Sequence, residues 1–375
     1  MRKCKWLSFL LLLPIIFVLT FTNCYIDPAN IFHDYSEEIA ESILRGNATH
    51  FGSSNVNERE VKHNLIIKMP DKVECIAVGP SLVMGVRSET AGSENFYNLG
   101  HSGANFYDIL AQFGLMEVYG KKIDRVVFCV DSYFFDEVLM KKREVNESLK
   151  EYADYMIDIL NGEDTEKPQE RDWNELETKV RQMFSVTYFQ ASVDSIQAAN
   201  SYMIDRERWG IVGEDFDETY YMSDASWVYA RSYQNKTEED VRKDSEAYNI
   251  ERQFSKGEHV SEYCKDIFEK LIRYLLSQRI ETDLYLCPVA PSLWDRIEEE
   301  ETEYPIIEEL EEYANRMAKK YNLKITGSYN PYNLDMEDKD FYDARHVRHE
   351  LLGTYFDFRS GRYTPQIEYP RSFLP

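Results

Sequence analysis

Short apolar segments alternate with segments of helical periodicity along most of this 375-residue chain, and this alternation limits the fold more than any other feature. Such a β-α-β pattern is typical of a parallel sheet with helices on its faces. The expected strands span residues 73–78, a short segment beginning at 96, then 125–130, 282–288 and 323–326. We therefore predict an α/β fold, a doubly wound parallel sheet of about five strands.

The expected strands also divide the chain into parts. Residues 1–24 are expected to form a cytoplasmic tip and an apolar anchor segment. Residues 25–69 are expected to form a linker and stem with an amphipathic stretch at 36–44, and residues 70–375 are expected to form the α/β domain. A charged, helix-rich insertion at about 137–257 interrupts the sheet. Two convincing helices follow it: an amphipathic one over 258–278 and one that opens at Pro305 and runs to about Tyr321.

The first expected strand ends abruptly at Gly79-Pro80-Ser81. A serine at the carboxyl end of the first strand lies where open α/β sheets place their ligands and reactive groups. A serine nucleophile needs a neighbouring base to become reactive. Taken alone, the segment is more often an ordinary turn.

A candidate base lies near the other end of the chain, in Asp343-Ala344-Arg345-His346. An Asp three residues ahead of a His places both side chains on one face of a helical turn. The carboxylate can then fix the imidazole tautomer and stabilise the imidazolium that forms when the base takes a proton. Ser81, His346 and Asp343 therefore make a candidate triad, provided that the fold brings them together.

Two further turns lie between these motifs. The segment Asn98-Leu99-Gly100-His101-Ser102-Gly103 runs into a helix, and Gly103 at the helix start could present its N–H to a developing oxyanion. The expected strand over 125–130 ends in Asp131-Ser132. Both segments are also compatible with plain strand ends of a parallel sheet.

Together these four segments resemble the SGNH (GDSL-like) hydrolase superfamily over about residues 70–355. The resemblance implies the flavodoxin-like strand order of that superfamily, with Ser81 as nucleophile and His346 as general base. It assigns Asp343 as the acid that orients the base, and the N–H groups of Ser81 and Gly103 as oxyanion donors. Asn98 and Ser132 lie in the corresponding accessory positions.

The sequence departs from that pattern at two places. Pro80 replaces the Asp that usually precedes the serine and removes a backbone donor. Asp131 or Ser132 stands where the superfamily has an Asn. An anionic Asp131 facing an oxyanion would oppose catalysis, so we expect it to point elsewhere or to position another group.

Such departures resemble the membrane-tethered branch of the superfamily, the DltD-like and alginate-acetylation-type acyltransferases. That resemblance implies acyl transfer to a cell-envelope polysaccharide, or action on an acylated glycan, together with a multi-span membrane O-acyltransferase.

The amino terminus fits this arrangement. Arg2, Lys3 and Lys5 precede an uncharged stretch over residues 6–22, close to the lower limit of about 17 residues for a transmembrane helix. Basic residues before the span favour a single-pass anchor in the cell membrane with the rest of the chain outside the cytoplasm; a cleaved signal peptide is the alternative.

Composition excludes several classes of function. A formal net charge of −24 argues against nucleic-acid binding, which needs a basic surface. The six cysteines have no zinc-like spacing, and those in expected strands are typical of small buried hydrophobic residues. We therefore expect no metal, no cofactor and no disulfide framework.

Weaker candidates concern substrate binding. The insertion carries an aromatic run that includes Tyr220, Tyr221 and Trp227. These rings could stack on sugars near Ser81, although packing of the insertion onto the core is the favoured explanation. Arg345 could bind an acidic sugar or a phosphate, although the favoured interpretation is an arginine exposed to solvent.

Two hypotheses of different class follow. The first is an exported, membrane-anchored serine O-acyltransferase or esterase that acts on a cell-envelope glycan through an acyl-enzyme on Ser81. The second is a non-catalytic SGNH-like scaffold or glycan-binding protein, motivated by Pro80 and the missing Asn. A membrane-anchored lipid esterase is a third possibility.

Overall fold

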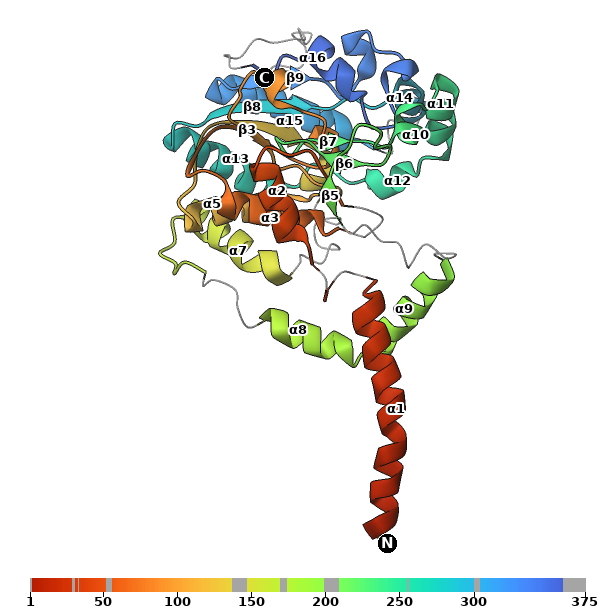
Figure 1. Cartoon of the computed structure of the whole chain (residues 1–375). Coiled ribbons are helices and arrows are strands. Elements are labelled where there is room, and N and C mark those ends of the chain that lie inside the picture. Colours follow the sequence, from red (N-terminus) through yellow and green to blue (C-terminus); the bar gives the residue numbers. More distant parts are fainter. Residues whose placement is uncertain are drawn as a thin grey trace.

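The computed structural model describes residues 2–28, 31–32, 34–51, 56–136, 147–168, 174–198, 209–254, 256–299 and 304–359. Figure 1 shows an α/β body from which one long helix, α1 (Arg2–Ile26), projects.

Five parallel strands form the central sheet, at the places where the sequence predicts them. They are β2 (Lys72–Val78), β3 (Phe96–Asn98), β4 (Lys122–Val130), β8 (Glu281–Leu286) and β9 (Lys324–Gly327), in the spatial order β3-β2-β4-β8-β9. This is the flavodoxin-like order, in which the direction of strand addition reverses beside the first strand. The reversal lies between β2 and β4. In open α/β sheets, the carboxyl ends of the strands at such a reversal border the usual ligand-binding crevice.

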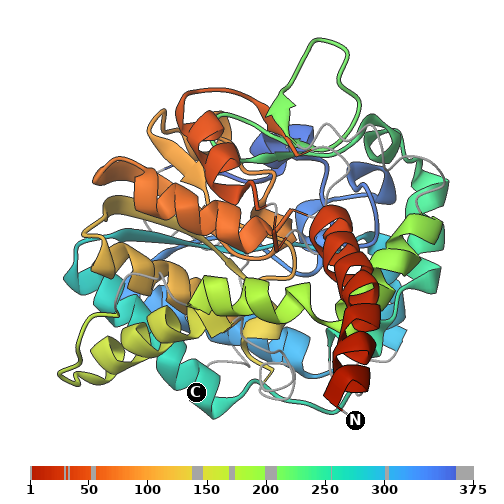
Figure 2. The ribbon, with the colours of Figure 1, turned by 60° about the horizontal axis from the view of Figure 1, so that its bottom comes forward.

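Both faces of the sheet are buried, which explains the nearly continuous apolar composition of its strands. Along β2, Ile76 and Val78 point into one apolar core and Cys75 and Ala77 into the other, because successive strand side chains point to opposite faces. The first core is covered by α2 (Ser36–Leu44), α3 (Glu58–Lys68), α5 (Phe106–Val118), α7 (Glu147–Asn161), α13 (Glu262–Ser277) and α15 (Ile306–Tyr321). Figure 2 shows several of these helices side by side.

The second core is covered by short elements. They include α4 (Ser88–Ala91), η4 (Pro331–Leu334) and α16 (Leu352–Tyr355), together with Val241 of α11 (Glu238–Ala247) and the residues that flank η5 (Asp338–Asp340) and η6 (His349–Leu351). The sheet therefore has helices on both faces, as a doubly wound fold requires, but only one face carries long helices. The short elements bring the end of the described chain back over β2 and β4.

Helices α2 and α3 belong to the α/β body, although they fall in the segment expected to be a linker and stem. The bounds of α2 match the predicted amphipathic stretch. Ile39 and Ile43 on α2, with Leu65 on α3, are fully buried in the first core.

The insertion is rich in helices over its described part, as predicted. It comprises α7, α8 (Asn174–Met183), α9 (Val186–Ala198), α10 (Arg231–Gln234), α11 (Glu238–Ala247) and α12 (Ile250–Gln253). It also contributes β5 (Gly210–Ile211), β6 (Tyr220–Tyr221) and β7 (Trp227–Val228), which form a small antiparallel sheet with β1 (Thr49–His50). Its expected first residues, 137–146, lie outside the described residues.

The two helices predicted after the insertion are present. The first, α13, begins at Glu262 because the Ser261 side chain accepts a hydrogen bond from the Cys264 N–H and caps it. Tyr263 in its first turn is 47% exposed, whereas Ile267 and Leu271 are buried. The second, α15, begins directly after Pro305 as expected. Helix α14 (Pro291–Glu299) lies between β8 and α15.

The projecting helix α1 exposes a series of large apolar side chains: Leu13, Ile15, Ile16, Phe17, Val18, Phe21 and Tyr25. Near its end the side chain of Asn23 donates hydrogen bonds to the carbonyls of Gln182 and Met183 at the end of α8 and of Ser185 just before α9. Within the described ranges, no helix reaches both the length and the hydropathy needed to cross a bilayer.

The strand cysteines are buried thiols, as predicted. Cys75 on β2, Cys129 on β4 and Cys287 directly after β8 are free and buried, and so is Cys264 on α13. In the described part of the chain, no three potential metal-binding side chains come together.

A buried lysine joins the stem segment to the sheet and the insertion. Lys62 on α3 is fully buried, and its Nζ donates to the carbonyls of Asn98 and Ala225, each at 2.7 Å. The ammonium also lies 4.7 Å from the centre of the Tyr221 ring. Burial lowers the pKa of Lys62 to about 7, because desolvation penalises the charged form.

This shift predicts a pH-dependent contribution to stability. In the unfolded chain Lys62 keeps its ordinary pKa of 10.5, so between about pH 7 and that value the unfolded state binds more protons and stability rises with pH. At about 1.4 kcal/mol per pKa unit the effect amounts to a few kcal/mol. We expect the stability of Lys62→Met, relative to the parent, to fall as pH rises through this window in denaturant unfolding. A difference between the two proteins that does not change with pH would contradict the assignment.

Candidate active site

The loop after β2 places Ser81 at the carboxyl edge of the sheet. Gly79 has φ +146°, and a Cβ there would lie 2.6 Å from the Cβ of Cys129 on β4. Only glycine allows the chain to turn this close to the neighbouring strand. Pro80 follows, and Ser81 begins the 3₁₀ helix η1 (Ser81–Val83).

The Asn98 side chain fixes the segment that follows Ser81. Its Nδ2 donates to the carbonyls of Val83 and Val86, both at 2.8 Å, and its Oδ1 accepts the N–H of Gly100 at 2.9 Å. Asn98 is fully buried. The amide is therefore used in holding the loop, and its accessory role is structural.

The Asp343–His346 segment is a tight turn and not the helical turn that we expected. The Phe341–Val347 bridge and a hydrogen bond from the Tyr342 N–H to the His346 carbonyl close it. The Asp343 carboxylate accepts the N–H groups of Arg345 and His346 at 2.7 and 2.8 Å. Because this side chain satisfies the local backbone donors itself, it competes with helix formation.

The fold brings Ser81, His346 and Asp343 into one hydrogen-bonded chain. His346 Nε2 lies 2.8 Å from Ser81 Oγ, and His346 Nδ1 lies 2.9 and 3.0 Å from the two Asp343 carboxylate oxygens. The side chains of His346 and Asp343 are 19% and 21% exposed, and Ser81 is half-buried. These distances are those of a nucleophile, a base and an acid that orients the base.

The Asp343 carboxyl is held in its charged form. Burial opposes this, but His346, the Tyr233 hydroxyl and the backbone N–H of Arg345 stabilise the carboxylate and hold its pKa well below the usual range. An ionised carboxylate at this place can stabilise an imidazolium on His346.

The candidate oxyanion donors are only partly defined. No described residue accepts a hydrogen bond from the N–H of Ser81. The N–H groups of Gly100, His101 and Ser102 already donate elsewhere: to the Asn98 side chain, to the Gly79 carbonyl and to the Glu58 carboxylate on α3, respectively. Gly103 follows this turn with φ +62° and is exposed; its role as a donor stays a prediction.

Asp131 is neutralised by Arg345, and the expectation of a solvated arginine was wrong. Arg345 is only 8% exposed, and its Nη2 lies 2.7 Å from Asp131 Oδ2. The guanidinium also lies over the Phe254 ring, 5.3 Å from its centre. Asp131 additionally accepts the N–H of Tyr133 at the start of η2 (Ser132–Phe134). As expected, Asp131 positions another group, and the pair ties the D-x-x-H turn to the end of β4.

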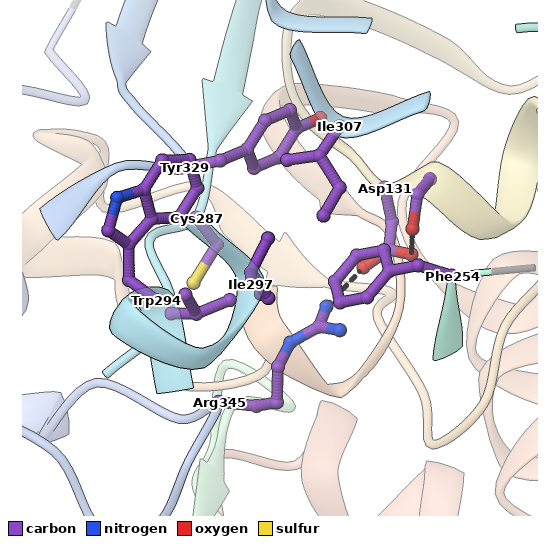
Figure 3. A pocket seen from close by; sticks show the side chains of 10 residues that line it. Asp131, Phe254, Cys287, Trp294, Ile297, Ile307, Tyr329 and Arg345 are labelled. Atoms are coloured by element: carbon purple, nitrogen blue, oxygen red, sulfur yellow. Dashed lines mark hydrogen bonds and ion pairs between the residues drawn. The ribbon is translucent and has the colours of Figure 1, made fainter. Parts of the chain in front are cut away.

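A small cavity lies beside this ion pair, and Figure 3 shows Arg345 and Asp131 together at it. Its remaining walls are mainly apolar: Phe254, Cys287, Val289, Trp294, Ile297, Ile307 and Tyr329, together with Ser132. The enclosed space is about 10 Å³, which is close to what one water molecule needs. It is too small for an acyl group or a sugar, so Arg345 and Ser132 are not placed to bind substrate there.

A larger, open groove of about 580 Å³ reaches the carboxylate side of the triad. It lies between the η2 loop, the insertion and the D-x-x-H turn. Its lining residues are Tyr133, Lys236, Asp244, Ala247, Tyr248, Asn249, Asp343 and Ala344. The size and the mixed aromatic and polar lining suit a polar small molecule or one or two sugar units.

The predicted aromatic binding residues do not form this groove. Tyr221 is fully buried and Trp227 is 8% exposed, and both pack against Phe51. Tyr221 and Trp227 therefore pack the insertion onto the core, as the favoured explanation expects, and the weaker assignment to substrate binding does not hold for them. Tyr220, which is half-buried, packs edge-on against Phe216.

The groove aromatics Tyr133 and Tyr248 were missed. Tyr133 directly follows Asp131-Ser132 at the end of β4, so its position at a strand end was a usable signal. Tyr248 follows α11 and carries no such signal.

Comparison with known proteins adds no identification. No family model matches this chain, and no curated protein matches it. The fold and the site geometry therefore have to support the functional assignment.

Proposed function

We propose that this chain is an SGNH-type serine O-acyltransferase or esterase that acts on a cell-envelope glycan. The observation that carries the proposal is the continuous hydrogen-bonded chain from Ser81 Oγ through His346 to Asp343. Its position at the carboxyl ends of parallel strands, beside the reversal of strand order, also supports it.

The proposed reaction has two halves. Ser81 Oγ attacks the acyl carbonyl of an ester or thioester while His346 Nε2 takes the hydroxyl proton, and Asp343 stabilises the imidazolium. The N–H of Ser81, with that of Gly103, holds the tetrahedral oxyanion. Collapse breaks the bond to the leaving alcohol or thiol, which takes the proton from His346. Water or a sugar hydroxyl, deprotonated by His346, then attacks the acyl-enzyme and restores Ser81.

The open groove supports a glycan as the acceptor or acyl donor. Tyr133 and Tyr248 offer ring surface, and Asn249 offers an amide donor and acceptor. Lys236 and Asp244, whose side chains lie 2.6 Å apart, add a charged pair to the same wall. Aromatic faces combined with hydrogen-bonding polar groups suit a polyhydroxylated ligand better than a lipid chain.

The membrane arrangement is part of the same proposal. Its support is the apolar exposed side of α1 together with the basic residues Arg2, Lys3 and Lys5 at its start. We propose a single-pass anchor with the α/β body outside the cytoplasm. A multi-span membrane O-acyltransferase would then be the partner that supplies the acyl group.

A non-catalytic scaffold or glycan-binding protein is the second candidate. Pro80 lacks a backbone donor, and no Asn stands at the end of β4, so two of the superfamily's features are absent from the site. Loss of a single oxyanion donor typically costs about 10²–10³ in rate. If the Ser81 N–H alone did not stabilise the oxyanion enough, the protein would bind the glycan without turning it over.

The two candidates are separated by offering the purified chain an activated acetyl ester with and without a neutral oligosaccharide. We expect ester cleavage that depends on His346. The acetyl group should appear on the sugar if the protein is a transferase, and only as free acetate if it is an esterase. The control is His63→Gln, which changes a histidine on α3 outside the site. Equal, background-level cleavage by the parent and His346→Gln, with retained oligosaccharide binding, would favour the scaffold.

A further inference from the structure

We infer that Tyr233, on the insertion, is a positioning residue that sets the basicity of His346 through Asp343. This inference rests on the proposed function and adds a fourth, distant member to the chain of three residues. Tyr233 lies 110 positions before Asp343 in the sequence.

The Tyr233 hydroxyl completes the hydrogen bonding of Asp343. It donates to Asp343 Oδ2, the oxygen that also lies 2.9 Å from His346 Nδ1. Asp343 Oδ1 already accepts two backbone N–H groups from its own turn. Both carboxylate oxygens are therefore held, and the rotation of the carboxylate that would release His346 is blocked.

The Tyr233 ring is itself held in place by an aromatic cluster. Its centre lies 4.6 Å from that of Tyr229 and 5.7 Å from that of Tyr342. Lys236 follows α10, and its ammonium lies 4.7 Å from the centre of the Tyr233 ring. Tyr229 in turn meets the His346 ring edge-on, at 5.9 Å between centres.

A second connection fixes α10 to the turn that carries the triad. The guanidinium of Arg348, two residues after His346, donates to the carbonyls of Gln234 and Lys236 at 2.7 and 2.6 Å. The insertion is therefore attached to this turn after Tyr233 through Arg348 and before it through the Tyr229 ring, so the hydroxyl is placed by the fold and does not depend on a single contact.

The electrostatic consequence has a definite sign. A hydrogen bond donated to the Asp343 carboxylate disperses its charge and weakens its attraction for a proton on His346. Removing the hydroxyl concentrates that charge on the imidazole side, which raises the pKa of His346.

The other groups around the pair do not replace this hydroxyl. Burial lowers the pKa of His349 to about 3, so it is neutral at physiological pH. Burial raises the pKa of Cys287 to about 12. Arg345 is paired with Asp131, and Asp244 with Lys236. Other titratable or charged neighbours in the described part of the chain include Tyr229, Tyr342, Glu58, Arg87 and Arg348.

The test is the titration of His346 in the full chain, followed by NMR of labelled histidine and assigned with His346→Gln. We expect Tyr233→Phe to raise the pKa of His346 by roughly 0.5–1 unit, a fraction of the effect of one hydrogen bond to a charged group, because the hydroxyl acts on the imidazole through Asp343. The matched control is Tyr342→Phe. It removes a hydroxyl from the same aromatic cluster, but that hydroxyl donates to Glu350, away from Asp343, so it should leave the titration unchanged.

An unchanged titration in Tyr233→Phe, or an equal shift in both variants, would overturn the inference. If Tyr233→Phe does not fold, site-specific 3-fluorotyrosine at position 233 tests it with the opposite sign. Its more acidic hydroxyl donates more strongly and should lower the pKa of His346, and an unchanged value there would overturn the inference equally. The measurement needs no substrate, so it can succeed or fail independently of the proposed acyl transfer.

Discussion

Replacing Ser81 by alanine is expected to lower ester turnover by up to about 10⁶-fold, the loss seen when the serine of an efficient triad is removed. The reason is that His346 Nε2, 2.8 Å from Ser81 Oγ, then has no hydroxyl to deprotonate. The fold should not change, because Ser81 is half-buried and its Oγ hydrogen bond is to His346. The measurement is steady-state hydrolysis of an activated ester, with thermal unfolding to confirm folding.

The matched control for this variant is Ser277→Ala. Ser277 ends α13 and its hydroxyl bonds only the nearby carbonyl of Tyr274 among the described residues. It should keep the parent's turnover. Full turnover in Ser81→Ala would exclude Ser81 as the nucleophile.

The second large effect concerns stability. Asp131→Asn installs the residue that the SGNH superfamily carries at this position, and the resemblance alone would suggest a gain in activity. We expect it instead to lower the free energy of unfolding by about 3–5 kcal/mol, because it leaves the buried Arg345 guanidinium without its carboxylate. Arg345 also belongs to the turn that carries Asp343 and His346, so activity should fall with stability.

A double-mutant cycle measures this effect directly. Asp131→Asn combined with Arg345→Gln removes both charges and should recover part of the loss in urea unfolding. An exposed pair on the same protein, Arg316 and Glu312, serves as control and should couple by less than about 1 kcal/mol. A coupling energy between Asp131 and Arg345 no larger than that between Arg316 and Glu312 would contradict the buried ion pair.

The fold was largely predictable because its signals are local. The five strands of the sheet are apolar runs whose composition reflects burial on both faces, and Pro305 marks the start of α15 within one residue. The packing of α2 and α3 into the core was not predictable in the same way. The amphipathic pattern of a helix predicts that its apolar face is buried, but it does not specify which part of the protein covers that face.

The candidate triad was predictable for a similar reason. Gly79 at a strand end and the D-x-x-H spacing are short patterns that geometry imposes on the chain. Contacts between distant segments left no such pattern. Tyr233 reaches Asp343 from the insertion, and Arg345 reaches Asp131 across 214 positions. For Trp227 and Tyr221 the sequence left both packing and sugar binding open, because an aromatic run has the same sequence signature in a core as in a binding surface.

The most direct test of the proposed chemistry is covalent labelling by a fluorophosphonate, which reacts with serines that a neighbouring base activates. The proposal predicts one adduct per chain, mapped by mass spectrometry to Ser81, formed more slowly in His346→Gln and absent in Ser81→Ala. No adduct on the folded parent protein, or an adduct on a different serine, would contradict it.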